Sequence, residues 1–157
     1  MFLEIKGIHK SFGTGESRIE VLKGLDMEIR KGEFCVLLGP SGSGKSTLLN
    51  IIGGIESADE GSISIEGEHL ADMTEKKLSQ YRRKHLGYIF QMYNLIPNLN
   101  IRENIEVGGY LSVHPLDTDE ILKTLGLYEH RNKLPNQLSG GQQQRIAGGR
   151  LAAQRRH

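Results

Sequence analysis

Residues 39–47 have the types and the spacing that bind the phosphates of a nucleotide. They are Gly-Pro-Ser-Gly-Ser-Gly-Lys-Ser-Thr, which match the pattern G-x-x-x-x-G-K-[S/T] without a mismatch. In such a loop, backbone amides and the N-terminus of the following helix face the phosphate oxygens, and glycines keep side chains out of the turn. We therefore predict that this phosphate loop binds a purine nucleoside triphosphate.

Several residues of the phosphate loop have expected roles of their own. Lys45 is a flexible point charge for the β- and γ-phosphates, the Ser46 hydroxyl is a ligand for Mg²⁺, and Thr47 is expected at the α-phosphate. The alternative is a Gly/Ser turn with an incidental lysine, which the spacing and context together disfavour. The loop residues predicted to bind nucleotide are Gly39, Ser41, Gly42, Ser43, Gly44, Lys45, Ser46 and Thr47.

A second segment, residues 138–142, also presents a helix N-terminus to an anion. Ser139 is a candidate N-cap, and Gly140 and Gly141 expose backbone amides at the start of a helix predicted over residues 142–153. Taken alone, this segment is a capped helix after a loop that contains Pro and Asn. A role in nucleotide binding is indicated only when this segment is considered together with the phosphate loop earlier in the chain.

The elements around the phosphate loop must position it. Residues 3–6 and 21–29 alternate between polar and apolar side chains, which indicates paired antiparallel strands. The apolar run 34–38, directly before the loop, is typical of a strand buried on both faces of a parallel sheet, and Cys35 in it is expected as a small packing residue. From Lys45 onward, apolar residues recur three and four apart, so the loop leads into a helix that ends at the next pair of glycines.

The rest of the chain is predicted to contain short strands and helices. The strands are expected over residues 62–67 and 86–90, and the helices from Asp72 or Thr74 toward Lys84, over residues 101–107, over 119–127 and over 142–153. There is no internal repeat and no low-complexity linker. We therefore expect one α/β core with smaller β and helical additions.

Composition limits the possible classes of protein. The chain has 157 residues, about one domain, and its 20 Lys and Arg nearly balance 19 Asp and Glu, which disfavours a general nucleic-acid binder. Its apolar runs fall short of the roughly 18 residues that a membrane span needs, and the N-terminus lacks the pattern of a secretory signal. The single cysteine excludes an internal disulfide, so the cytosol is the expected compartment.

Together, the phosphate loop and residues 138–142, Leu-Ser-Gly-Gly-Gln, resemble the nucleotide-binding motifs of ABC-transporter ATPase subunits. The resemblance runs from about residue 2 to Arg150. Residues 20–25, 90–97 and 138–145 look most like bacterial exporters of the lipoprotein-release, macrolide and antimicrobial-peptide type. The resemblance implies a P-loop NTPase core of the ABC ATPase type, with an N-terminal antiparallel β subdomain and a helical subdomain.

The resemblance also implies roles for single residues. Phe12 stands where the family places an aromatic that stacks on adenine, usually a tyrosine; an ordinary packing residue is the alternative. Gln91 matches a glutamine that reaches Mg²⁺ and the attacking water; a polar residue at a strand end is the alternative. Lys45 and Gln91 are thus the expected catalytic residues, and Ser46 and Gln91 the expected metal ligands. Residues 93–97 would face a membrane permease subunit.

The resemblance further implies a head-to-tail homodimer that forms on ATP. The phosphate loop of one chain and the signature segment of the other, residues 138–142 here, enclose each nucleotide. ATP and Mg²⁺ are therefore the expected cofactors. The signature residues implied to bind the nucleotide of the second chain are Ser139, Gly140, Gly141 and Gln142.

The sequence departs from the family after the signature helix. Members carry an Asp-Glu pair on a buried strand and then a switch histidine, whereas no Asp or Glu follows Glu129 here, and His157 lacks the preceding strand. We therefore expect a single, incomplete ABC-type ATP-binding domain over residues 1–157, missing its C-terminal core strands. The strand predicted over residues 34–38 would then lack a neighbour and expose an apolar edge.

The leading hypothesis is an ATP-binding subunit of an ABC exporter. It would couple MgATP binding and hydrolysis to a membrane permease at the cytoplasmic face of the cell membrane. One alternative is a truncated nucleotide-binding remnant without ATP turnover, which the missing carboxylates favour. Another is a soluble ABC ATPase that serves no transporter.

Overall fold

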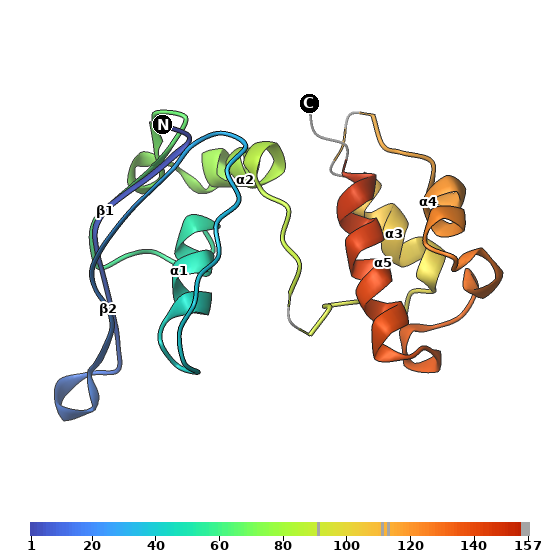
Figure 1. Ribbon diagram of the computed structural model, residues 1–157, viewed down its shortest axis with the longest axis horizontal. Helices are drawn as coiled ribbons and strands as arrows, with labels where there is room; N and C mark the ends of the chain where they lie inside the picture. Colours follow the sequence, from blue (N-terminus) through green and yellow to red (C-terminus); the bar gives the residue numbers. More distant parts are fainter. Residues whose placement is uncertain (91, 111, 113, 155–157) are drawn as a thin grey trace. The chain divides into compact units, whose positions relative to one another are not determined.

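The structure is a computed structural model that describes residues 1–90, 92–110, 112 and 114–154. The chain divides into two compact units, Met1–Arg82 and a second that begins at Arg83. Figure 1 labels the main helices and strands, and each unit is described by itself below.

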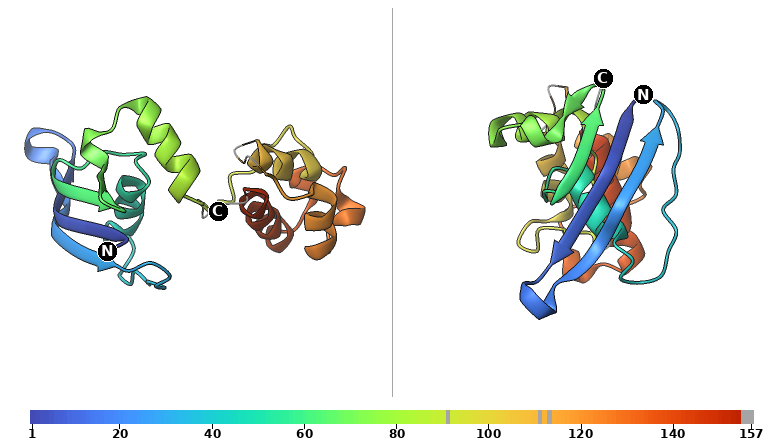
Figure 2. Two further views of the ribbon diagram at one scale, coloured as in Figure 1. Left: turned by 90° about the horizontal axis from the view of Figure 1, so that it is seen from above. Right: turned by 90° about the vertical axis from the view of Figure 1, so that its left-hand side faces the viewer.

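The first unit is built on a four-stranded antiparallel sheet with the strand order β2-β1-β3-β4. The strands are β1 (Leu3–Phe12), β2 (Ile19–Ile29), β3 (Glu60–Ile65) and β4 (Glu68–His69), with 3-10 turns η1 (Gly15–Ser17) and η2 (Leu70–Asp72). Helix α1 (Lys45–Ile52) lies behind the sheet in the right-hand view of Figure 2. The polar helix α2 (Glu75–His85) contains the boundary between the two units.

Side chains from the sheet, from α1 and from α2 form the core of the first unit. Leu3 of β1 pairs with Ile29 of β2 on one side and with Ile65 of β3 on the other. The buried hydrophobic residues are Leu3, Ile5, Ile8, Leu22, Leu48, Ile51, Ile63, Ile65 and Tyr81. The antiparallel strands and the helix predicted after the phosphate loop are thus confirmed.

The second unit is helical. Its elements are α3 (Ile101–Gly109), α4 (Thr118–Thr124), α5 (Gly140–Ala153) and the 3-10 turns η3 (Tyr128–His130) and η4 (Pro135–Gln137). Its core contains Ile101, Ile105, Ile121, Leu122, Leu127, Leu138, Ile146 and Ala153. Gly149 lets α5 approach its neighbours, because a Cβ there would lie 2.7 Å from Leu125 Cδ1. Figure 1 shows α3 and α4 beside α5.

Two predicted strands do not form. Residues 34–38 and 86–90 lie outside any strand, and the sheet found in the described part of the chain is wholly antiparallel. Phe34 and Leu38 are 90% and 89% exposed, and Cys35 is exposed rather than buried. An apolar run favours extended, buried backbone, but a strand also needs hydrogen-bonding neighbours, and neither run has a strand partner among the described residues. The apolar side chains of Phe34, Val36 and Leu38 are exposed, but on backbone that belongs to no strand rather than along a strand edge as expected.

Candidate nucleotide-binding site

The phosphate loop turns sharply into α1 through glycines with left-handed backbone. Gly42 has φ +79° and Gly44, the N-cap of α1, has φ +84°. A Cβ on Gly44 would lie 2.9 Å from both Val21 Cγ1 and Leu22 Cδ2, so the loop sits directly against β2. Only glycine meets both the conformation and the close approach at position 44.

The Lys45 side chain folds back into the phosphate loop. Its Nζ donates hydrogen bonds to the carbonyl oxygens of Gly39 at 2.9 Å and Pro40 at 2.7 Å, and to Ser43 Oγ at 3.2 Å. Gly39 also lies close to this cluster, since a Cβ there would be 2.6 Å from Ser43 Oγ. The Lys45 ammonium thus lies among oxygen acceptors of the loop. A bound anion, whose oxygens are stronger acceptors, can replace them as its hydrogen-bond partners.

The first turn of α1 is suited to an anion. Gly44 has no side chain to cap the first amides, and the turn contains no acidic residue. Ser46, which is exposed, and Thr47, which is half-buried, are the second and third residues of α1, so both lie in the first turn, where the partial positive charge of the helix concentrates. The exposed residues Ser41, Gly42 and Ser43 complete the loop.

Phe12 is the last residue of β1. It pairs with Ile19 of β2, and its side chain is 43% exposed. The Nζ of Lys10 lies 5.5 Å from the centroid of the Phe12 ring, within the range of a cation–π interaction. Phe12 is therefore not a buried packing residue.

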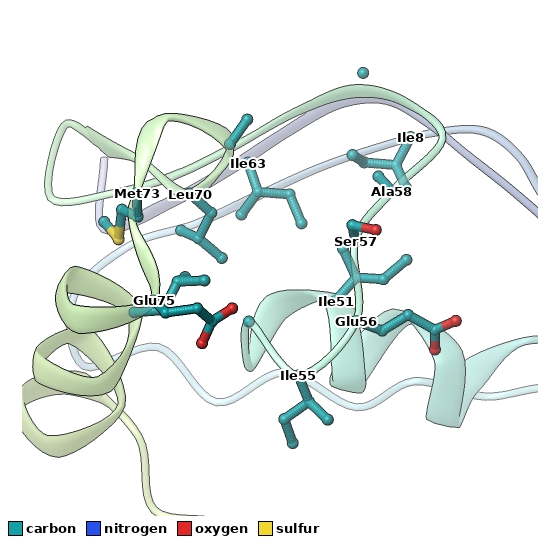
Figure 3. A pocket seen from close by; sticks show the side chains of 14 residues that line it. Ile8, Ile51, Ile55, Glu56, Ser57, Ala58, Ile63, Leu70, Met73 and Glu75 are labelled. Atoms are coloured by element: carbon teal, nitrogen blue, oxygen red, sulfur yellow. The ribbon is translucent and has the colours of Figure 1, made fainter.

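The first unit also contains a cavity of about 390 Å³ that is separate from the phosphate loop. Figure 3 shows apolar side chains, such as Ile8, Ile51, Ile63 and Leu70, around it. No residue of the phosphate loop lines this cavity, so we do not assign the nucleotide to it.

The signature segment begins α5 with the predicted cap. Ser139 Oγ accepts a hydrogen bond from the Gln142 amide at 3.3 Å, and Gln142 Oε1 accepts one from the Ser139 amide at 2.9 Å, which together form a capping box. Gly140 and Gly141 are exposed, and a Cβ on Gly141 would meet open space. The N-cap prediction for Ser139 is confirmed.

The loop expected to face a permease is held by two side chains that the sequence patterns did not single out. Arg150 of α5 donates to the carbonyl oxygens of Tyr93 at 3.1 Å and Asn94 at 2.9 Å, where both residues have left-handed backbone. Burial lowers the pKa of Arg150. The fully buried Asn104 of α3 accepts from the Ile96 amide at 2.8 Å. Gln91, the predicted ligand before this loop, lies outside the described residues.

The chain is similar in sequence and in structure to known proteins. Residues 22–157 match the family described as ABC transporter. The bacitracin export ATP-binding protein BceA of Halalkalibacterium halodurans is 47% identical over 94% of this chain, and the lipoprotein-releasing system ATP-binding protein LolD of Bacteroides fragilis is 42% identical over 92%. A solved dimeric structure of the ATP-binding cassette MJ0796, in a post-hydrolysis state bound to ADP and Pi, covers 97% of this chain with a TM-score of 0.86 and 38% identity.

The chain is shorter than the proteins that it matches. It spans 60% of the length of BceA, 68% of LolD and 69% of the MJ0796 chain, and between 23% and 67% of the length of other curated relatives. None of the helices in the described residues has the length and apolar character to cross a membrane. Because the family match covers most of the sequence and the fold agrees with that of MJ0796, this chain belongs to the ABC transporter family and has the α/β fold of its ATP-binding cassettes.

Proposed function

We propose that the chain is the ATP-binding subunit of an ABC exporter and that it binds MgATP through the phosphate loop. The observation that carries the proposal is the Lys45 ammonium, which lies inside the loop among three oxygen acceptors. The phosphate oxygens of a bound triphosphate are stronger acceptors for this cation than carbonyl and hydroxyl groups are. They would also meet the uncapped amides at the start of α1.

The residues present fit Mg²⁺ and ATP. Ser46 supplies a hydroxyl ligand for the metal, and the first turn of α1 brings no carboxylate against the phosphates. When bound, Mg²⁺ would neutralise charge on the β- and γ-phosphates. We assign Gln91 as the second metal ligand and as a catalytic residue with Lys45, and we assign Phe12 to the adenine ring.

We further propose that the nucleotide brings two copies of the chain together head to tail. In that dimer, the signature segment of each copy would bind the nucleotide of the other. Its exposed glycine amides at Gly140 and Gly141 support this role, and the MJ0796 cassette is itself dimeric. Residues 1–157 would act as part of one ATP-binding domain that docks on a membrane permease at the cytoplasmic face. The export functions named for BceA and for the macrolide export protein MacB support an exporter.

The test of ATP binding is thermal unfolding of the full chain with and without excess MgATP. A ligand that binds only the native state stabilises it by about 2.7 kcal/mol at 100 times its Kd, so the unfolding midpoint is expected to rise. Lys45→Ala is expected to abolish the rise. Lys31→Ala is the matched control. The Lys31 side chain is 85% exposed, and its ammonium pairs with Glu66 Oε1 at 3.7 Å, away from the phosphate-loop residues. If Lys45→Ala keeps the full rise, the phosphate-loop assignment is wrong.

A second candidate function is nucleotide binding without turnover. The described part of the chain holds no group of three or more His, Cys, Asp or Glu side chains that could bind a metal ion, which favours this candidate, since phosphoryl transfer needs a carboxylate to hold Mg²⁺ and a group that positions water. Release of inorganic phosphate by the purified chain separates the two candidates. Release that Lys45→Ala abolishes supports an ATPase, whereas an ATP-dependent thermal shift without release supports binding alone.

A further inference from the structure

The end of β1 that carries Phe12 extends past the regular part of the sheet. The pairing of β1 with β3 ends at His9 opposite Glu60, and the pairing of β1 with β2 shifts register between Lys10 and Ser11. The last residues of β1 therefore have no β3 partner, and some other group must hold them on that side. Asp59, the residue directly before β3, is that group.

Asp59 contacts three consecutive residues of β1. Its backbone amide donates to the His9 carbonyl oxygen at 2.9 Å, its Oδ2 accepts from the Ser11 amide at 2.7 Å, and its Oδ1 accepts from Lys10 Nζ at 3.2 Å. The hydrogen bond from Ser11, followed by the one from Lys10, lowers the pKa of Asp59 below its ordinary value. The carboxylate thus takes the place of a strand partner for the residue next to Phe12.

The Lys10 side chain is held by several contacts besides the one with Asp59. Its side chain is only 11% exposed, and its Nζ also donates to the Ser57 carbonyl oxygen at 2.8 Å and pairs with Glu56 Oε1 at 3.6 Å. These contacts restrain the Lys10 ammonium. They therefore set its position 5.5 Å from the centroid of the Phe12 ring. The cation is attracted to the negative face of the Phe12 ring, and the residue remains 43% exposed, which leaves room for another group at the ring.

We propose that Asp59 and Lys10 are positioning residues that hold the Phe12 ring for stacking on the purine base of the bound nucleotide. The inference rests on the proposed function, because it concerns the base end of the same ATP site. Asp59 fixes the backbone through Ser11, and Lys10 holds the ring through the cation–π contact. Neither residue needs to touch the nucleotide.

The experiment compares two ligands on the full chain by titration calorimetry: MgATP, and inorganic tripolyphosphate with Mg²⁺, which has the phosphates but no base. Asp59→Ala and Lys10→Met are expected to raise the Kd for MgATP about three- to tenfold, by analogy with the loss of part of a base–aromatic stack. The Kd for tripolyphosphate should stay within about twofold, since stacking makes no contribution to it. Lys10→Arg, which keeps a cation over the ring, should restore most of the MgATP affinity.

Two further variants separate positioning from a general structural effect. Lys6→Met removes an exposed lysine of the same strand, 63% exposed and paired with Glu4, and should change neither Kd. In a Phe12→Ala background, Asp59→Ala should cause no further loss of MgATP affinity, because its effect passes through the ring. If Asp59→Ala shows no cooperative thermal transition, Lys10→Met alone is the loss variant, and Asp59→Asn, which keeps an oxygen acceptor for the Ser11 amide, should retain most of the MgATP affinity.

The outcomes distinguish this inference from the proposed function. Equal weakening of both ligands by Asp59→Ala, or a loss that persists in the Phe12→Ala background, overturns the positioning role and leaves the phosphate loop in place. An unmodified chain that binds tripolyphosphate as tightly as MgATP shows that the base makes no contact, which also overturns the inference. A chain that binds neither ligand refutes the proposed function, and the inference falls with it.

Discussion

Replacing Gly44 by alanine should destabilise the first unit by two additive effects. An L-residue at φ +84° pays a left-handed backbone cost of roughly 1–2 kcal/mol. The new Cβ would also lie 2.9 Å from Val21 Cγ1 and Leu22 Cδ2 and 3.1 Å from the Val21 carbonyl oxygen, so the loop or β2 must move, at about 1–3 kcal/mol. The free energy of unfolding should therefore fall by about 2–5 kcal/mol.

Gly42→Ala is the matched control for this prediction. Gly42 has a similar φ of +79°, but a Cβ there would have no heavy atom within 4 Å, so only the backbone cost of roughly 1–2 kcal/mol applies. Urea unfolding followed by circular dichroism measures both variants, and their difference isolates the steric effect of β2. Equal losses for Gly44→Ala and Gly42→Ala would refute the close packing of the loop on β2.

Three further predictions concern the rest of the chain. Ser139→Arg should abolish ATP-dependent dimerisation in sedimentation velocity, while the cap-retaining Ser139→Asn remains folded; an arginine variant that still dimerises contradicts the role of the signature segment. Asn104→Ala should lower the free energy of unfolding by about 1–3 kcal/mol, because the Ile96 amide loses its acceptor, and an unchanged urea midpoint would contradict this. The depressed pKa of Asp59 means that its ionised form stabilises the fold above its ordinary value of 3.8, and that this contribution is lost as the pH falls through the folded-state pKa. The difference in Tm between the chain and Asp59→Asn should therefore be constant above pH 3.8 and shrink below it; a difference that already shrinks near neutral pH would show that another group is responsible.

Local patterns predicted the elements that depend on local interactions. The alternation in residues 3–6 and 21–29 predicted β1 and β2, because each residue of a half-buried strand faces either core or solvent. The cap at Ser139 was also predictable, because its partner Gln142 lies three residues away. The glycines of the phosphate loop indicated its sharp turn, because glycine adopts left-handed backbone without steric cost.

Residues 34–38 show where local patterns fail. Their apolar side chains favour a buried strand, yet burial depends on neighbouring strands that are distant in sequence and that the described residues do not provide. The contacts behind Phe12 were missed for a related reason. Lys10 and Asp59 are 49 residues apart, and only the pairing of β1 with β3 brings them together.

Because Cys35 is exposed, the chain has one natural site for labelling with a thiol reagent. It is the single cysteine of the sequence, and its thiol is open to solvent. A maleimide dye would therefore attach at one position without any engineered substitution, because no second thiol competes. Since Cys35 lies four residues before Gly39, we expect the fluorescence of the attached dye to change when a ligand binds the phosphate loop.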